Sequence, residues 1–339
     1  MKILITGGAG YIGSHTCLEF LRRDHALHVV DNLENGNFEA LRRVKMLSNG
    51  SIDFTKCDVR DSASLAEVFH KFQPDAVVHF AGLKSIKESI AIPARYYDVN
   101  VGGTAVVLNC MENANCQNFV FSSSATVYGE PLYLPCDEGH VLKPINPYGR
   151  TKLIGEQLVE DWGSADKGRH AVALRYFNPV GAHISGLIGE QPKGVPNNLM
   201  PMVAQVASGT HDYLKIYGND YETVDGTGVR DYIHVSDLAH AHVAAVEKMS
   251  ELAPFEAINI GTGRGVSVLE LVREFERQSD KKINFNFVSR RFGDAPAVWA
   301  DASKAVRKLQ FNTKLGISEM CRDTWNWTQQ NPQGYQCVD

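Results

Sequence analysis

Tyr148 and Lys152 are the two residues whose types and spacing point most directly to chemistry. They lie in the segment 146–152, NPYGRTK, where Asn146 is a good helix N-cap and Pro147 suits the first helical position. The predicted helix places the phenol and the ammonium one turn apart on one face. The alternative is that both are ordinary exposed side chains on a helix surface.

A tyrosine normally loses its proton near pH ~10, too high for a general base at neutral pH. A lysine ammonium ~6 Å away, at an effective dielectric of ~20, favours the tyrosinate by about 2.8 kcal/mol, or roughly two pKa units. Burial acts in the opposite direction because it disfavours the anion. If positive charge dominates, Tyr148 becomes a base near pH ~7, and Ser124, at the end of a predicted strand, would bind the same substrate oxygen.

A glycine-spaced turn near the N-terminus predicts a dinucleotide site. The apolar run 3–5 leads into the segment 6–13, TGGAGYIG, which contains Gly7, Gly10 and Gly13. Such glycines make a tight turn, let backbone N–H groups reach a pyrophosphate and allow a helix to pack on the strand. The helix N-terminus would then face the anion. Taken alone, the spacing also fits an ordinary turn.

A second apolar run, 27–30, ends at Asp31, about where this fold places the carboxylate that accepts the adenosine ribose hydroxyls. This carboxylate would repel a 2'-phosphate, and the segment 32–35, NLEN, has no arginine to accommodate one. The cofactor is therefore predicted to be NAD rather than NADP. Its cationic nicotinamide ring would lower the pKa of Tyr148 by an amount comparable to the effect of Lys152.

Composition limits the class of protein. The chain has 339 residues, 44% hydrophobic and 22% charged, enough for two lobes around one cleft. A net charge of -5 argues against a nucleic-acid or anionic membrane surface. Seven scattered cysteines without a Cys-x-x-Cys pair suit reduced thiols. With no signal segment and no apolar run near ~18 residues, we expect a cytoplasmic protein.

Apolar runs alternate with helical patterns up to residue 177, which predicts an α/β fold with a doubly wound parallel sheet of the Rossmann type. Ligand residues should follow strand ends, although each such segment alone also fits a turn or cap. The loops 181–201 and 218–228 are rich in glycine and proline and predict a smaller mixed α/β substrate lobe. Ser267 begins a capping box that opens a helix to about residue 279. The six strands are predicted near 2–6, 27–31, 51–56, 75–80, 117–122 and 171–177, and the residues that follow three of them are Asp58 and Val59, 80–84, and 122–124.

The glycine segment together with Tyr148-x-x-x-Lys152 resembles the extended short-chain dehydrogenase/reductase family. Within it, further segments over essentially the whole chain look like those of UDP-hexose 4-epimerases: 79–84, 122–129, 175–183, 196–201, 228–234 and 299–301. The resemblance implies an NAD-binding domain at 1–178, to which a segment around 229–262 would return, and a UDP-sugar-binding lobe at 179–339.

The resemblance also implies site residues. For the chemistry they are Tyr148, Lys152 and Ser124. For NAD they are Gly7, Gly10, Tyr11, Ile12, Gly13, Asp31, Asn32, Asn35, Asp58, Val59, Phe80, Ala81, Gly82, Lys84, Asn100, Tyr148, Lys152 and Phe177. For the UDP-sugar they are Lys84, Ser124, Thr126, Tyr148, Asn178, Asn198, Leu199, Tyr217, Arg230, Arg291, Asp294 and Val298. Two arginines suit a diphosphate, and an aspartate can accept from ribose hydroxyls.

The implied reaction is reversible epimerisation of UDP-galactose and UDP-glucose at C4. Tyr148 would take the proton of the 4'-hydroxyl while hydride passes to NAD, and the 4-keto sugar would turn over before the hydride returns. The resemblance further implies a homodimer, formed through helices near 93–114 and 148–165.

Two other functions remain open. A nucleotide-sugar 4,6-dehydratase shares the oxidation step but needs an additional acid/base pair, where this chain has Ala125 and Thr126. A non-catalytic NAD-sensing protein could use the same fold, although the three catalytic residues argue against it. No metal is expected, since His-Glu-x-x-His is missing and His240 and His242 should lie on different faces of a helix.

Two positions depart from the resemblance. Val298 stands where some epimerases have a tyrosine, and the smaller side chain would leave room beside C2 of the hexose. Activity on UDP-N-acetylhexosamines is therefore a hypothesis. Val99, an asparagine in some relatives, puts one cofactor contact in doubt.

Overall fold

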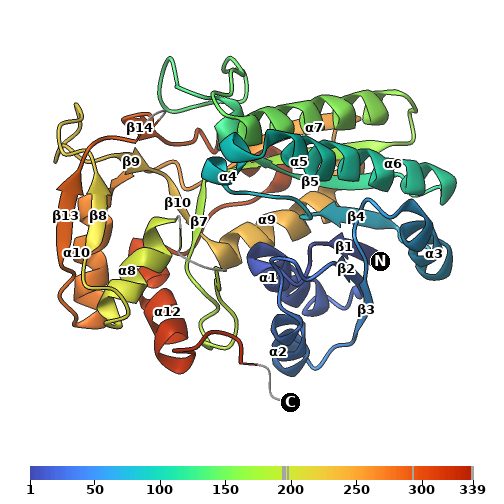
Figure 1. Cartoon of the computed structure of the whole chain (residues 1–339). Helices are drawn as coiled ribbons and strands as arrows, with labels where there is room; N and C mark the ends of the chain where they lie inside the picture. Colours follow the sequence, from blue (N-terminus) through green and yellow to red (C-terminus); the bar gives the residue numbers. More distant parts are fainter. Residues whose placement is uncertain (193–195, 197, 292–293, 337–339) are drawn as a thin grey trace.

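A seven-stranded parallel sheet forms the centre of the computed structural model, which describes residues 1–192, 196, 198–291 and 294–336 (Figure 1). The strand order β11-β6-β5-β4-β1-β2-β3 confirms the predicted doubly wound sheet. Its strands are β1 (Lys2–Thr6), β2 (Ala26–Asp31), β3 (Ile52–Lys56), β4 (Ala76–His79), β5 (Asn118–Ser124), β6 (His170–Tyr176) and β11 (Phe255–Ile260).

Two details of the sheet differ from the sequence prediction. β5 continues to Ser124 rather than ending at residue 122, so the three serines are part of the strand and pair with β6. β11 is a seventh strand, beyond the six that were predicted, and it pairs with β6 at the edge of the sheet. Its partner lies about eighty residues earlier in the chain, so no local pattern indicates the pairing.

Helices cover both faces of the sheet, because successive strand residues point to opposite sides and both sides are apolar. Ile3 and Ile5 pack with residues of α1, α2 and α9, whereas Leu4 packs with residues of α3, α6 and α7. The bounds are α1 (Tyr11–Leu21), α2 (Phe38–Ser48), α9 (Val235–Lys248), α3 (Ser62–Phe72), α6 (Gly103–Asn113) and α7 (Pro147–Ser164). The shorter α4 (Ile86–Ala91), α5 (Pro93–Tyr97) and the π-helical turn η1 (Asp98–Gly102) precede α6.

The second lobe lies beyond the edge of the sheet, at the left in Figure 1. Its core is formed by residues of α8, α10 and α12, and it contains three small sheets of two or three strands. The elements are β7 (Asn178–Val180), α8 (Leu199–Ala207), β8 (Leu214–Tyr217), β9 (Val229–Arg230), β10 (Tyr232–His234), β12 (Val266–Ser267), α10 (Val268–Ser279), β13 (Phe285–Val288), β14 (Ala297–Val298) and α12 (Ile317–Gln330). The remaining short elements of the chain are η2 (Ala125–Val127), which follows β5, η3 (Met249–Glu251), which follows α9, and α11 (Ser303–Leu309).

Local sequence signals set two helix starts as predicted. Asn146 caps α7 by accepting the backbone N–H of Gly149, with Pro147 as the first helical residue. Ser267 forms the expected capping box with Glu270 at the start of α10.

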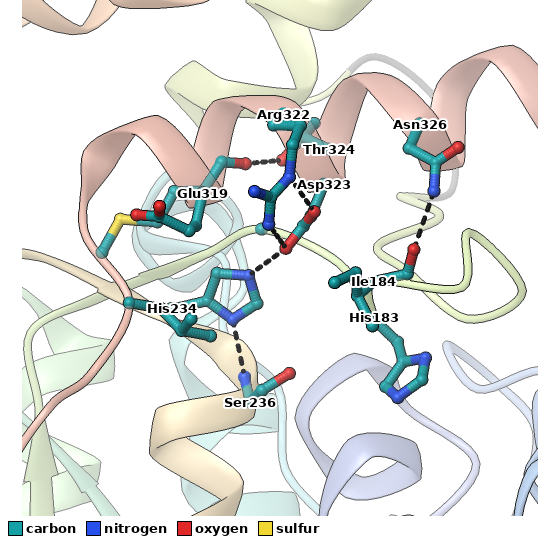
Figure 2. Close-up of polar contacts among 12 residues, drawn as sticks. His183, Ile184, His234, Ser236, Glu319, Arg322, Asp323, Thr324 and Asn326 are labelled. Atoms are coloured by element: carbon teal, nitrogen blue, oxygen red, sulfur yellow. Dashed lines mark hydrogen bonds and ion pairs between the residues drawn. The ribbon is translucent and has the colours of Figure 1, made fainter. Parts of the chain in front are cut away.

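Polar contacts tie α12 to the start of α9 (Figure 2). The ring of His234, the N-cap of α9, accepts the backbone N–H of Ser236 at Nδ1. Nε2 therefore carries the hydrogen and donates to Asp323 of α12, at 3.2 Å. Arg322 also donates to Asp323, and Asn326 donates to the carbonyl of Ile184. α12 thus anchors both β10 and the loop that follows β7.

None of the helices in the described part of the chain is long and apolar enough to cross a membrane.

Candidate active site

The glycine turn between β1 and α1 brings backbone segments too close together for a side chain. Gly7 has a φ of 71°, and a Cβ on it would lie 2.6 Å from the backbone nitrogen of Ala81. A Cβ on Gly13 would lie 2.4 Å from the carbonyl oxygen of Gly7. α1 begins after Gly10, which offers no side-chain cap to its first N–H groups. This cradle fits the pyrophosphate of a dinucleotide.

Asp31 is buried at the carboxyl end of β2, beside the glycine turn. Its carboxylate accepts the backbone N–H groups of Ala9, at 3.0 Å, and Leu33, at 2.8 Å. A Cβ on Gly36 would come within 2.9 Å of both carboxylate oxygens, so the loop after β2 closes tightly over them. The position suits the predicted contact to a ribose, and the fit supports a dinucleotide with an unphosphorylated ribose.

Asp58 belongs to a charged group that the sequence analysis did not include in full. Arg60 donates to Asp58 at 2.8 Å and to Asp98 at 2.6 Å, and Asn32 donates to Asp58 at 3.1 Å. The hydrogen bonds from Arg60 are the main reason that the pKa of Asp58 lies well below its usual range. Arg60 lies two residues after Asp58, a local spacing that could have indicated the pair.

The loop after β4 is held by the buried side chain of Asn100 in η1. The amide oxygen accepts the N–H of Leu83 at 2.7 Å, and the amide nitrogen donates to the carbonyl of Leu83 and to the hydroxyl of Thr151, both at 3.0 Å. Asn100 therefore fixes the backbone of this loop. Lys84, at its end, forms an ion pair with Glu190 of the loop that follows β7, at 3.0 Å.

The three predicted catalytic residues meet where β5 ends and α7 begins. Ser124 lies close enough to Tyr148 for its hydroxyl to act on the phenol and lower its pKa. Lys152 Nζ lies 6.0 Å from the centroid of the Tyr148 ring and donates to the carbonyl of Ser122 at 2.6 Å. Thr126 donates its hydroxyl to Ser124 at 3.0 Å. One face of α7 thus presents a phenol and an ammonium to the end of the strand, as the helix prediction expected.

Burial opposes ionisation of both groups. Desolvation raises the pKa of Tyr148, and the hydrogen bond from Ser124 only partly offsets this rise. The pKa of Lys152 is lowered to about 8, again by desolvation, while the nearby Glu156 acts to raise it. In the chain by itself, then, the ammonium of Lys152 does not make Tyr148 acidic. Of the two opposing effects on the pKa of Tyr148, burial is therefore stronger than the positive charge of Lys152.

Glu156 is a residue that sequence reasoning missed, one turn beyond Lys152 on α7. Arg175 of β6 donates to its carboxylate from Nη2, at 2.7 Å, and from Nε, at 2.9 and 3.2 Å. Both side chains are only 4% exposed, and Ser123 also donates to Glu156. The i, i+4, i+8 spacing of Tyr148, Lys152 and Glu156 is the signal that could have found it.

In the second lobe, two predicted substrate residues lie on adjacent strands. Arg230 of β9 is opposite Val298 of β14 in the parallel pairing. Arg230 donates to the carbonyl of Val229 at 2.8 Å. Val298 packs against a small apolar cluster that includes Val127 and Phe177, which joins the lobe to the end of β6.

Arg291 and Tyr217 also lie together, with the guanidinium carbon 3.9 Å from the centre of the phenol ring. Asp294 lies close enough to act electrostatically on Tyr221, whose ring contacts Arg290. Asn198 begins α8 and donates to Glu190 at 3.3 Å, so Glu190 contacts both Lys84 and Asn198.

The remaining predicted residues lie in varied surroundings. Tyr11 donates its hydroxyl to the carbonyl of Gly181 at 2.6 Å, which links α1 to the second lobe. Phe80 packs against His242, with ring centres 4.7 Å apart. Of the other predicted residues, five are buried or partly buried: Ile12, Val59, Ala81, Phe177 and Leu199. Three are exposed: Asn35, Gly82 and Asn178.

No group of three or more potential metal ligands occurs among residues 1–192, 196, 198–291 and 294–336. His240 and His242 lie on α9, as predicted, with different partners: His240 contacts Glu19, and the buried His242 contacts the hydroxyl of Tyr176.

Six cysteines among the described residues are free and buried. Cys337 and Asn197 lie outside the described residues.

Fold and site together define an NAD-binding enzyme of the extended short-chain dehydrogenase/reductase class. A family model described as GDP-mannose 4,6 dehydratase matches residues 4–324. UDP-glucose 4-epimerase of Bacillus subtilis is 50% identical, with 100% of each chain covered, and that of Bos taurus is 50% identical, with 98% of each covered. A crystal structure of UDP-glucose 4-epimerase from Bifidobacterium longum with NAD+ and UDP is 45% identical, with a TM-score of 0.95 and 99% and 100% of the two chains covered.

The chain belongs to the UDP-glucose 4-epimerase family, is an isomerase and uses NAD. The dehydratase and the non-catalytic alternative are thereby set aside. Ala125 and Thr126, which follow Ser124, are consistent with this outcome, because neither can serve as the carboxylic acid pair that water elimination requires.

Proposed function

We propose that this enzyme interconverts UDP-galactose and UDP-glucose, with Tyr148 exchanging the proton of the sugar 4'-hydroxyl. The observation that supports this assignment is the contact between Ser124 and Tyr148, with Lys152 6.0 Å from the phenol ring. Two neighbouring hydroxyls can share one substrate oxygen, so Ser124 would hold the oxygen that Tyr148 deprotonates. The ammonium of Lys152 would favour the deprotonated form of Tyr148 by its positive charge.

The protonation states follow from burial. Near pH ~7 the buried phenol of Tyr148 keeps its proton, and Lys152, with its pKa at about 8, is mostly charged. Tyr148 is thus poised as an acid, and it becomes a base when positive charge increases nearby. NAD, when bound, supplies the acceptor for the C4 hydride and, in its oxidised form, that additional charge. Tyr148 then takes the hydroxyl proton and later returns it to the same oxygen, so no net proton is consumed.

The two lobes would bind different ligands. We assign 1–178 and the returning segment around 229–262 to NAD, and 179–339 to the UDP-sugar. Arg230 and Arg291 would pair with the diphosphate, which a chain of net charge -5 attracts only through local cations. Asp294 would accept from the ribose hydroxyls. Firm anchoring of UDP with a loosely held hexose would let the keto sugar turn and present its other face.

Val298 supports a wider substrate range. It is partly buried beside Phe177 and Ala300 in the apolar cluster at the end of β6. A valine there occupies less space than a tyrosine, so an N-acetyl group at C2 of the hexose could be accommodated. We expect turnover of UDP-N-acetylglucosamine, and a Val298→Tyr variant should lose this activity while still converting UDP-glucose. If the unaltered enzyme converts UDP-glucose but not the N-acetylated sugar, the wider range is wrong.

We also propose a cytoplasmic homodimer. α6 and α7 run side by side on one face of the sheet (Figure 1). A groove between them is lined by Leu108, Leu158 and Trp162, with Asn109, Glu112, Asp161 and Arg169 also contributing. The Trp162 indole nitrogen is buried without a hydrogen-bond partner in the described part of the chain. A groove of mixed apolar and charged side chains between two helices is suited to a second copy of the same helices. Equilibrium sedimentation, with charged substitutions at Leu158, would test the assignment.

The decisive experiment on catalysis compares the enzyme with its Tyr148→Phe variant. Purified protein should carry NAD, and UDP-galactose should give UDP-glucose without NADH accumulating in proportion to product. Tyr148→Phe should lower kcat by about 10²–10⁴-fold, the usual worth of a proton-transfer group, while NAD remains bound. Tyr335→Phe, which removes the hydroxyl of a buried tyrosine that contacts the backbone of Gly189, is the matched control. Unchanged turnover in Tyr148→Phe would refute the assigned role.

A further inference from the structure

A single carboxylate joins a residue of the predicted NAD site to a residue of the predicted UDP-sugar site. Glu190 lies in the loop that follows β7, and its Oε1 is 3.0 Å from Nζ of Lys84 and 3.3 Å from the amide nitrogen of Asn198. A carboxylate only accepts hydrogen bonds, so both partners donate to the same oxygen. Through this oxygen, Glu190 connects the loop after β4 to the start of α8.

Glu190 is the fixed member of this group. Its side chain is 10% exposed, whereas that of Lys84 is 66% exposed. The loop 181–190 is held along its length by side chains of other elements, which donate to its backbone carbonyl groups. These bonds run to Gly181 from Tyr11, to Ile184 from Asn326 (Figure 2), to Leu187 from Arg43 and to Glu190 from Trp327. The carboxylate therefore has a set position, to which the flexible lysine is attracted.

The surroundings of the two partners connect Glu190 to the active site. Two residues before Lys84, a Cβ on Gly82 would lie 3.9 Å from the ammonium of Lys152, so this loop passes close to the catalytic lysine. Asparagine is a favoured N-cap residue, yet the side chain of Asn198 makes no capping hydrogen bond within the described part of the chain. Its amide donates to Glu190 instead, so Glu190 sets the orientation of Asn198.

We propose that Glu190 is a positioning residue, which places the ammonium of Lys84 and the amide of Asn198 before the ligands of this enzyme bind. The inference rests on the proposed function, since it takes Lys84 and Asn198 as residues that bind NAD and the UDP-sugar. Glu190 itself need not touch either ligand. It restricts the rotamers of two polar side chains in advance, and binding then no longer loses affinity through ordering them.

The sign of the effect distinguishes positioning from simple charge. NAD and UDP-sugars both carry a negative diphosphate group, and a carboxylate near such a group repels it. The carboxylate also competes with the ligands for the ammonium of Lys84. If Glu190 acted through its charge alone, its removal would strengthen binding. If it positions its two partners, its removal weakens binding.

The test compares the unaltered enzyme with Glu190→Ala and Glu190→Gln in the conversion of UDP-galactose, with NAD added in excess. Glu190→Ala should raise KM by about two- to tenfold, the usual effect of losing one hydrogen bond. It should leave kcat within about twofold, because Ser124, Tyr148 and Lys152 are untouched. Glu190→Gln keeps an acceptor for Asn198 but no charge for Lys84, so it should raise KM less. The dissociation constant of UDP, measured by calorimetry, should change in the same order.

Glu67→Ala is the matched control, since it also removes a carboxylate that pairs with an exposed lysine, Lys71 of α3, and it should leave KM unchanged. Lys84 is exposed, so loss of its ion pair should change stability little, and Glu190→Ala should fold. A KM in Glu190→Ala equal to or below that of the unaltered enzyme would overturn the inference. If the unaltered enzyme fails to convert UDP-galactose, the proposed function is wrong instead, and the dissociation constants of UDP still test Glu190.

A second comparison tests whether the effect runs through Lys84. In the Lys84→Ala variant, the further substitution Glu190→Ala should raise KM by a smaller factor than it does in the unaltered enzyme, because one of the side chains that Glu190 places is already missing. Equal factors in the two enzymes would contradict the positioning of Lys84.

Discussion

Replacing Glu156 by glutamine should destabilise the protein strongly, because it removes the counter-charge of a buried arginine. The substitution preserves shape and removes only the negative charge. Arg175 would then keep a guanidinium that is 4% exposed, and its three contacts of 2.7 to 3.2 Å would be to a neutral amide. Breaking a buried ion pair from one side costs about 3–5 kcal/mol.

That cost is a large part of the usual stability of a domain, about 5–15 kcal/mol. The control is Glu256→Gln, because Glu256 also bonds two cations, Lys304 at 2.7 Å and Lys308 at 2.9 Å. Those lysines are 22% and 43% exposed, so water can solvate them when the carboxylate is lost. Loss of the Glu256 charge should therefore cost less than loss of the Glu156 charge, since the partner cations keep contact with water.

Urea denaturation followed by tryptophan fluorescence would measure both variants at pH ~7.5. Glu156→Gln should unfold at much lower urea than the unaltered protein, and Glu256→Gln close to it. The double variant Glu156→Gln, Arg175→Met should recover much of the loss, because it removes the unpaired charge as well. Equal midpoints for Glu156→Gln and Glu256→Gln, or a double variant worse than Glu156→Gln, would refute the reasoning.

Two other outcomes are expected. The pKa of His15 and of His79 is lowered to about 3, and that of His242 to about 4, so below pH ~6.5 the unfolded chain binds protons that the folded chain does not. Stability should therefore fall as pH drops from ~6.5, by up to about 1.4 kcal/mol per unit for each ring, and His79→Gln should flatten the urea midpoint plotted against pH. Gly13→Ala should abolish NAD retention, since its Cβ would lie 2.4 Å from a carbonyl oxygen, whereas Gly10→Ala, with its nearest contact at 3.2 Å, should keep part of it, as measured by absorbance of the purified proteins.

The parts of the fold that local sequence determines could be predicted. The strand and turn patterns indicate six of the seven strands, and Asn146 and Ser267 mark helix starts because capping needs only residues three or four apart. β11 escaped prediction as a sheet strand because its pairing with β6 joins residues far apart in the chain. The same holds for the contact between Tyr176 and His242, which lie 66 residues apart and meet only when α9 packs on the sheet.

The chemistry of the site shows why spacing alone is not enough. The ammonium of Lys152 lies 6.0 Å from the centroid of the Tyr148 ring, so the helix brings the two groups near each other, as its spacing predicted. What the sequence could not supply was the desolvation that raises the pKa of the phenol and lowers that of Lys152 to about 8. Because of this burial, Tyr148 keeps its proton unless further positive charge is brought into the site. In the mechanism that we propose, Tyr148 would act as a general base only when the cofactor that accepts the hydride is in place, and this would couple proton removal to hydride removal.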